Sequence, residues 1–144
     1  MKGTCYLSSQ RGTDATGMAI IFEDAITVVK RPIPSPQFIK EVIPKHAKTI
    51  AKANMVIGHT RKWTQGKPQD NHNNHPIVSE SWVMVHNGMC SSMDRIKDYK
   101  YHGEVDSEIL LSYVEKCGIE EGLSYLQGCA SIATVTNKEL NKLY

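Results

Sequence analysis

The chain has 144 residues, of which 40% are hydrophobic and 22% charged, and its formal net charge is +2. This composition predicts one globular domain over residues 1–144 and excludes an electrostatic nucleic-acid binder, which would carry a clustered basic face. No apolar run approaches the roughly 18 residues of a membrane span and no secretory signal is present, so we expect a cytoplasmic protein without membrane contact.

Hydrophobic periodicity predicts helices alternating with strands along the first half of the chain. A short helix over residues 1–10 leads into a buried strand over residues 17–22, which pairs as a hairpin with a strand over residues 26–30. A helix capped by Ser35, with Pro36 at its first position, and a second helical run over residues 44–53 follow. Strands over residues 55–57 and 82–85 then enclose a long polar loop.

The second half is predicted to be more helical. Helices are expected over residues 93–99, from residue 106 to a stop at Gly118, and over residues 120–126. A strand follows over residues 131–136, and residues 140–144 would begin another. Asp106 heads the strongest helix, where its carboxylate acts as a cap, binds a ligand, or does both with its two oxygens.

Most chemically unusual residues fall within residues 58–88, which hold four of the six histidines. Arg61 follows the first strand of this stretch and offers a planar fork of donors that suits a carboxylate, with the Thr60 hydroxyl beside it. Asn87 and Gly88 end the next strand and offer a side-chain amide and an unobstructed backbone N–H, a pair that can stabilise an oxyanion. The loop between the strands therefore predicts a functional pocket.

A metal site is not expected from these histidines. His59, His72, His75 and His86 suffice by number, but the sequence pattern does not place an acidic or thiolate partner beside them, so polar loop residues bonding to backbone are the simpler interpretation. The four cysteines are scattered without a Cys-x-x-Cys pair and are expected to be reduced.

Several short motifs together resemble the glutaminase domain of the class II glutamine amidotransferases, which are N-terminal nucleophile hydrolases. They occur in the family's order, close to its spacing, and span most of the chain. They are residues 11–17 (RGTDATG), 58–61 (GHTR), 74–76 (NHP), 79–80 (SE), 83–88 (VMVHNG) and 105–108 (VDSE). The first is most similar to copies carried by bacteriophages, which implies the host cytoplasm. The resemblance implies an α+β fold, a trimmed αββα sandwich of antiparallel sheets with flanking helices.

The resemblance also assigns roles to individual residues. Arg61 would bind the α-carboxylate of glutamine, Asp106 its α-ammonium group, and Asn87 with Gly88 would form the oxyanion hole. The ligand-binding positions are Thr60, Arg61, His75, His86 and Asp106, and the positions that support the site structurally are Arg11, Asp14 and His59.

The sequence departs from the family at its N-terminus. The family's nucleophile is an N-terminal cysteine on a strand that precedes a helix and the first motif, but only ten residues precede Arg11 here. A strand of about five residues and a helix of about ten need more chain. We therefore expect the nucleophile strand to be missing, with Cys5 on the entering helix, and the family's C-terminal strands to be missing as well.

Three functions remain open. The first is a non-catalytic protein whose pocket binds glutamine or another small anionic or amino-acid-like compound. The second is an active glutamine amidohydrolase or amidotransferase domain, completed by a separate chain or using Cys5, and the third is a protein-binding inhibitory module. No cofactor is expected. Exposed strand edges predict a homo-oligomer or a completing partner chain.

Overall fold

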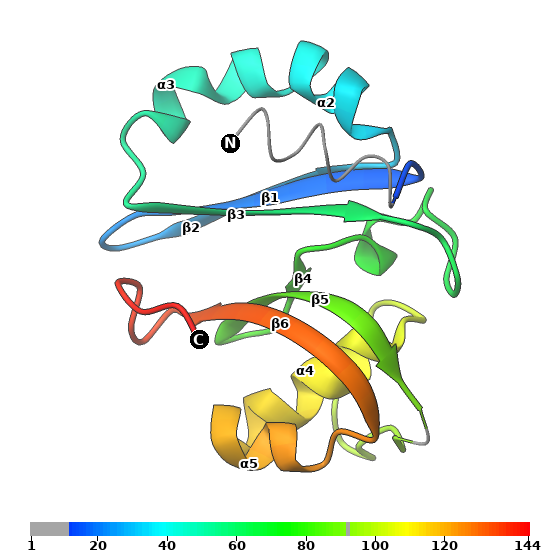
Figure 1. Ribbon diagram of the computed structural model, residues 1–144. Coiled ribbons are helices and arrows are strands. Elements are labelled where there is room, and N and C mark those ends of the chain that lie inside the picture. Colours follow the sequence, from blue (N-terminus) through cyan, green and yellow to red (C-terminus); the bar gives the residue numbers. More distant parts are fainter. Residues whose placement is uncertain (1–11, 92) are drawn as a thin grey trace.

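The computed structural model of the chain describes residues 12–91 and 93–144 and shows four layers (Figure 1). In the described part, two three-stranded antiparallel sheets face each other, and helices cover the outer face of each sheet. This αββα arrangement confirms the predicted α+β class with antiparallel sheets and flanking helices. The predicted helix over residues 1–10, with Cys5, and the predicted role of Arg11 lie outside the described residues.

The first sheet has the strand order β2-β1-β3. Its central strand β1 (Ala15–Ile21) is buried at every position because one face meets the helices and the other meets the second sheet. β2 (Ile26–Arg31) pairs with it through the predicted hairpin, and β3 (Met55–Arg61) pairs along its other edge. Arg61 therefore ends β3, next to the long loop.

Short helices form the layer outside this sheet. They are α2 (Ser35–Glu41), the 3₁₀ turn η1 (Ile43–His46) and α3 (Ala47–Ile50). Phe38 and Val42 of this layer pack against Met18 and Ile20 of β1. The predicted cap was wrong: Pro34 precedes the helix as its N-cap, while Ser35 is the first helical residue and is fully buried.

The second sheet has the strand order β4-β5-β6. Its strands are β4 (Ile77–Val78), β5 (Trp82–Cys90) and β6 (Gly128–Thr136). Val83 of β5 and Val135 of β6 pack against Ile21 and Ile57 in the core between the sheets. β5 continues past the predicted end at Val85, because β6 pairs with it as far as Cys90.

Two helices cover the outer face of the second sheet, α4 (Asp106–Cys117) and α5 (Ile119–Ser124). Leu110, Leu111 and Val114 of α4 are fully buried against Met84 of β5. Asp106 is the first helical residue, and Val105 is the N-cap, so the predicted cap was again placed one residue late. Within the described residues, no helix combines the length and the apolar character that crossing a bilayer requires.

Two predicted elements are absent. Residues 93–99 form irregular backbone with a turn at residues 97–98 instead of a helix. Side chains outside this segment bond its backbone: Tyr101 accepts from Ile96 N (2.8 Å), and Tyr113 donates to Asp94 O (3.1 Å). Residues 140–144 form no strand either. Their last residue, Tyr144, nevertheless exchanges two backbone hydrogen bonds with Thr134 at the outer edge of β6.

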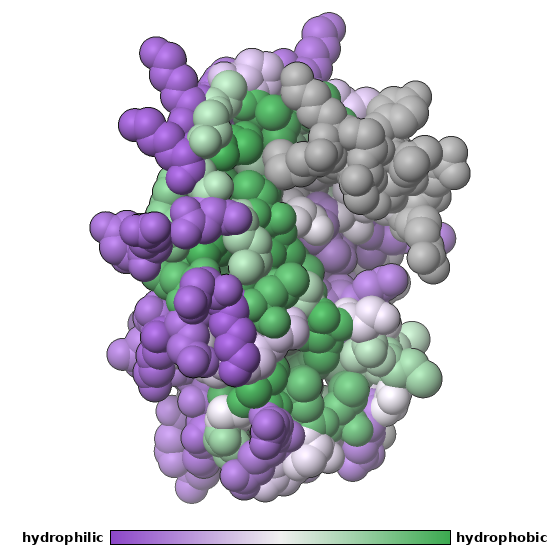
Figure 2. Space-filling model, turned by 60° about the vertical axis from the view of Figure 1, so that its left-hand side comes forward, coloured by the Kyte–Doolittle hydropathy of each residue, from purple (hydrophilic) through white to green (hydrophobic). Residues whose placement is uncertain are grey.

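One flank of the molecule is apolar. Figure 2 shows hydrophobic side chains running from the helical layer across both sheets on this flank. A groove of about 320 Å³ lies between the turn that precedes β2 and the segment that joins β4 to β5, with Leu140 from the C-terminal segment. Val78 in this groove is 42% exposed, which is high for so apolar a residue.

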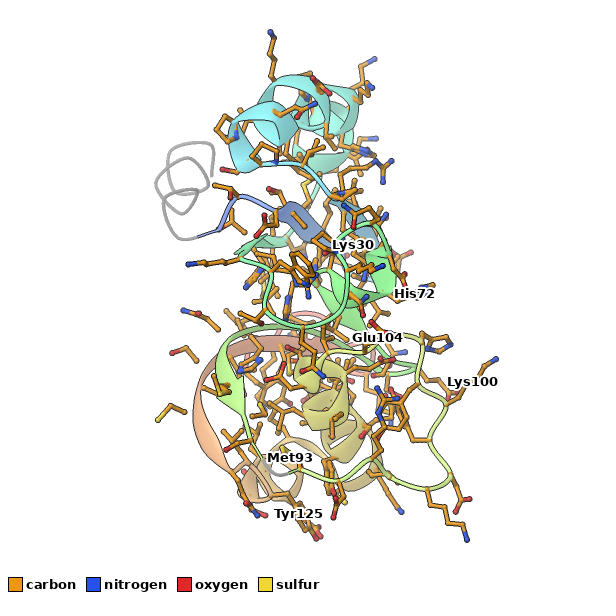
Figure 3. All side chains as sticks on the ribbon, turned by 90° about the vertical axis from the view of Figure 1, so that its right-hand side faces the viewer. Lys30, His72, Met93, Lys100, Glu104 and Tyr125 are labelled. Atoms are coloured by element: carbon orange, nitrogen blue, oxygen red, sulfur yellow. The ribbon has the colours of Figure 1, made fainter. Side chains whose placement is uncertain are left out.

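The loop between β3 and β4 is held against the first sheet by its main chain. Lys30 Nζ donates to the carbonyl oxygens of Asn74 (2.8 Å) and Pro76 (2.9 Å). Gly17, the cross-strand partner of Lys30, lies so close that a Cβ atom there would be 2.1 Å from the His75 oxygen. Figure 3 shows Lys30 on the first sheet with His72 of the loop just below it. The sheet therefore fixes the end of the loop that carries His75.

Candidate functional site

A pocket of about 400 Å³ lies where the end of β3 meets β5 and the start of α4. The predicted site residues that line it are Thr60, Arg61, His75, His86, Asn87, Gly88 and Asp106, together with His59. Other residues in its wall, which the sequence did not single out as site residues, are Gly58, Lys62, Thr64, Gln65, Val105 and Ser107. The structure thus brings the predicted positions to one cavity, while the ligand-binding role of each remains a prediction.

Arg61 is only 5% exposed, and its guanidinium group is bonded to the loop that follows it. Its Nη1 donates to Asn74 Oδ1 (3.0 Å), and its Nη2 donates to Gly66 O (2.9 Å) and Gln65 O. A planar fork with several donors suits this role, since it satisfies acceptors from three directions at once. Arg61 therefore orders the loop and places a positive charge in the pocket wall.

Asn87 and Gly88 lie on the exposed stretch of β5, opposite Ser131 and Ala130 of β6. The Asn87 amide forms no hydrogen bond with the described part of the chain. Gly88 has φ 149°, and a Cβ atom there would be 2.0 Å from Cys129 O, so both conformation and space require glycine. The pocket therefore contains an amide that is available to a ligand next to backbone without a side chain.

Both oxygens of Asp106 accept backbone N–H groups. Oδ1 accepts from Ser107 N (2.8 Å) and Oδ2 accepts from Cys90 N (2.9 Å). These bonds fix the carboxylate between α4 and the end of β5. Because each carboxylate oxygen has two lone pairs, both retain the capacity to bind a further group in the pocket.

Three histidines from separate segments converge in the pocket wall. The ring centroids of His59 and His75 are 4.2 Å apart, and Ser107 Oγ joins His75 Nε2 (3.1 Å) to His86 Nδ1 (2.9 Å). His59 Nε2 donates to the His86 carbonyl oxygen at 3.1 Å. Among the described residues, the buried Nδ1 atoms of His59 and His75 have no hydrogen-bond partner.

Burial keeps these histidines neutral. It lowers the pKa of His59 to about 4 and lowers the pKa of His75 and of His86 as well, because an imidazolium would lose its hydration in this wall. For His75, the nearby positive charge of Arg61 acts in the same direction. The three histidines therefore contribute polar but uncharged groups to a wall that also contains Arg61, Lys62 and Asp106.

Asp14 supports the site without lining it. Its carboxylate accepts from Trp63 N (2.7 Å), and its backbone N–H donates to Arg61 O (3.0 Å), so it fixes the chain where β3 passes into the loop. Trp63, which follows Arg61 closely, is 53% exposed and is not among the residues that line the pocket.

The four histidines that could have formed a metal site by number do not converge. His72 lies on the surface, where its Nδ1 is 2.9 Å from Asp70 and its ring stacks on His102. A different group does come together, namely His86, Cys90 and Asp106, whose potential ligand atoms all lie within 4.8 Å of one another. Their sequence separations match no metal-binding motif, so this group could not be predicted from the sequence.

Comparison with known proteins is consistent with this architecture. The family description "Glutamine amidotransferases class-II" matches residues 5–126. A glutamine–fructose-6-phosphate aminotransferase from Francisella tularensis is 30% identical over 92% of this chain, and one from Streptococcus pneumoniae is 40% identical over 81% of it. The chain spans 24% and 19% of the lengths of these two relatives.

Solved structures support the fold at much lower sequence identity. The glutamine phosphoribosylpyrophosphate amidotransferase from B. subtilis has a TM-score of 0.66 at 17% identity, covering 92% of this chain and 31% of that protein. A structure described as the allosteric regulatory enzyme of purine biosynthesis has a TM-score of 0.70 at 18% identity, covering 94% and 32%. With the family match extending over residues 5–126, this chain belongs to the class II glutamine amidotransferases.

Proposed function

We propose that the domain binds glutamine, or a closely similar α-amino acid, in the pocket between β3, β5 and α4, and that it does so without catalysing hydrolysis. Asp106 pairs with the α-ammonium group of the ligand, and the positive charge of Arg61 attracts its α-carboxylate. The Asn87 amide and the Gly88 backbone bind the carbonyl oxygen of the side-chain amide. Family membership supports this assignment, since the curated relatives are named for their use of glutamine.

The availability of Asn87 is the observation that carries the proposal. Its side chain is exposed in the pocket and has no partner in residues 12–91 and 93–144, whereas the charged groups of Arg61 and Asp106 in the same wall are both hydrogen-bonded. A free amide donor beside a carboxylate and a buried arginine matches the zwitterionic end and the amide end of glutamine. A purely structural role would leave no reason for such an arrangement.

The absence of an activated nucleophile in the described pocket supports the non-catalytic part of the proposal. No cysteine of residues 12–91 and 93–144 lines the pocket. Cys90 packs into the core beneath it, where burial raises the pKa of the thiol to about 12, so it stays protonated. Ser107 also belongs to the pocket wall, but its hydroxyl is bonded to two histidines and the residue is only 2% exposed, so little of it is open to a ligand.

The test compares L-glutamine with glutaramic acid, which lacks the α-ammonium group, by calorimetry in buffer containing EDTA. We expect wild-type protein to bind L-glutamine at least about tenfold more tightly, the usual scale of one charge-assisted contact. In Asp106→Asn this preference should vanish, while in Asp98→Asn, a change to an exposed carboxylate elsewhere, it should persist. Equal affinities in the wild type, or a preference that survives Asp106→Asn, would contradict the assignment.

A second candidate is an active glutaminase that uses Cys5. The family match begins at residue 5, so Cys5 stands at the start of the matched region, outside the described residues. Ammonia release from glutamine separates the two functions. The non-catalytic proposal predicts none, with no change in Cys5→Ala, whereas release that Cys5→Ala abolishes would establish the enzyme.

A further inference from the structure

The group formed by His86, Cys90 and Asp106 has the composition of a transition-metal site. Imidazole, thiolate and carboxylate together favour zinc over magnesium or calcium, which prefer oxygen ligands. The distance between His86 Nε2 and Cys90 Sγ is 3.7 Å. Two ligands of one tetrahedral zinc ion, with Zn–N of about 2.0 Å and Zn–S of about 2.3 Å, lie about 3.5 Å apart. These two atoms therefore already have the separation that zinc requires.

The backbone of β5 creates this proximity. Residues four apart on an extended strand are separated by roughly 13 Å, so His86 and Cys90 would not normally meet. Gly88 lies midway with φ 149°, and Gly128, opposite Cys90, has φ 132°. The pair of strands curves here (Figure 1), and His86 Nε2 and Cys90 Sγ come within 3.7 Å of each other. Glycines at these two positions thus serve the geometry of the group.

Hydrogen bonds already orient two of the three ligand residues. Ser107 Oγ lies 2.9 Å from His86 Nδ1, and when this nitrogen carries the proton, Nε2 has the free lone pair that a metal needs. Asp106 is fixed by the N–H groups of Cys90 and Ser107 and retains lone pairs on both oxygens. Partners of this kind are typical of the outer shell of metal sites.

We propose that His86 Nε2, Cys90 Sγ and one carboxylate oxygen of Asp106 form a zinc site in the wall of the pocket. Zinc replaces the thiol proton of Cys90, which is released to solvent, and the sulfur binds the metal as thiolate. Since His86 and Asp106 both line the pocket, the fourth coordination position faces it and takes water or a ligand atom.

Occupancy of this site has a consequence for amino-acid binding. Asp106 is the carboxylate that pairs with the ligand ammonium group under the proposed function, so zinc and glutamine compete for it. By linkage, each should weaken the other by the same factor. This competition rests on the proposed function, whereas the zinc site itself does not.

The test uses protein stripped with EDTA, desalted, and titrated with Co²⁺ and then Zn²⁺ in the absence of any amino acid. We expect one Co²⁺ per chain, with a near-ultraviolet cobalt–thiolate band that Zn²⁺ displaces. Cys90→Ser should abolish the band, whereas Cys117→Ser, which removes a cysteine from the other end of α4, should leave it intact. Asp106→Asn should retain the band and weaken affinity at least about tenfold, the usual scale for a disturbed ligand set.

X-ray absorption on the zinc-loaded wild type gives an independent answer if Cys90→Ser does not fold. One sulfur with nitrogen or oxygen neighbours supports the proposal, and a shell without sulfur overturns it. A thiolate band that survives Cys90→Ser also overturns it. Glutamine binding is measured separately, in EDTA. If glutamine does not bind, the proposed function is refuted and the zinc site is unaffected. If the metal titration fails, the zinc site is refuted and the proposed function is unaffected.

Discussion

At the scale of single residues, the histidine cluster has an energetic cost when it is protonated. His59, His75 and His86 are neutral in the folded chain because burial lowers the pKa of each, and in the unfolded chain they return to about 6.5. Between the folded and the unfolded pKa values, the unfolded state binds more protons. Stability is therefore complete above about pH 6.5 and is lost as the pH falls below it.

This gives a prediction for unfolding at mildly acidic pH. Each histidine contributes up to about 1.4 kcal/mol per pH unit below 6.5, and His59 alone accounts for about 3 kcal/mol by pH 4. Urea unfolding between pH 7 and pH 5 measures this slope before most carboxylates titrate. His59→Gln should flatten the slope, and His72→Gln, a change to the exposed loop histidine, should leave it unchanged. A slope of zero in the wild type would contradict the neutral cluster.

The sequence predicted the members of this site better than their contacts. Arg61, Asn87 and Asp106 were assigned from residue type and from the resemblance, and all three line one pocket. The bonds from Arg61 to the loop, the bridge through Ser107 and the approach of Cys90 to His86 were not predicted. They depend on how the loop folds back and where β5 bends, and neither follows from local periodicity.

At the scale of elements, two glycines on neighbouring strands differ in the space available for a side chain. A Cβ atom on Gly17 in β1 would be 2.1 Å from the His75 oxygen, whereas one on Gly58 in β3 would be 3.9 Å from its nearest neighbour. Gly17→Ala should lower the free energy of unfolding by about 3 kcal/mol, since neither the sheet nor the loop can yield without loss of packing. Gly58→Ala should be neutral or stabilise by up to about 1 kcal/mol.

Chemical denaturation of the two variants checks this pair of expectations. If Gly17→Ala leaves the free energy of unfolding unchanged, the loop is not held against β1 as described. Glutamine binding by Gly17→Ala adds a second readout. Displacement of His75, which lines the pocket, should weaken it.

The hairpin strands β1 and β2 and the long helix α4 were predicted well because their apolar patterns are strong, whereas the helix predicted over residues 93–99 was wrong. Their spacing of Met93, Ile96 and Tyr99 suits a helix, yet the backbone groups there bond to Tyr101 and Tyr113. Both bonds tie the backbone to side chains outside the segment, and Tyr113 is 19 residues away from its partner Asp94, so these bonds replace the internal bonds of a helix. Tertiary contacts of this kind are invisible to a local pattern.

At the scale of the whole molecule, the outer edges of β3 and β6 and one apolar flank are open in the described part of the chain. β3 pairs only with β1, and β6 pairs only with β5 apart from the two bonds to Tyr144. The apolar groove with Val78 lies on the flank that Figure 2 displays. Open edges and apolar grooves are features that proteins cover by association.

We therefore expect self-association, most simply as a two-fold dimer that buries at least about 1,000 Å² in total. Sedimentation velocity over a range of micromolar concentrations measures it. Val78→Lys should shift the equilibrium towards monomer, and Tyr125→Lys, an exposed position beyond α5, should not. A wild-type chain that remains monomeric throughout would show that the open edges do not pair with a second copy.

The clamp on the β3–β4 loop has a consequence for how recognition could be changed. Lys30 donates hydrogen bonds to backbone carbonyl oxygens, which every amino acid possesses, so these bonds do not depend on the side chains of the loop. Three exposed residues line the pocket and precede the bonded residues Asn74 and Pro76 in the chain, namely Lys62, Thr64 and Gln65. The backbone bonds that position His75 are therefore separate from the three exposed side chains at the pocket rim, and these side chains can be changed without altering the bonds. Substitutions at these three positions, whether by evolution or in a randomised library, can therefore change which ligand the pocket prefers while the fold stays intact.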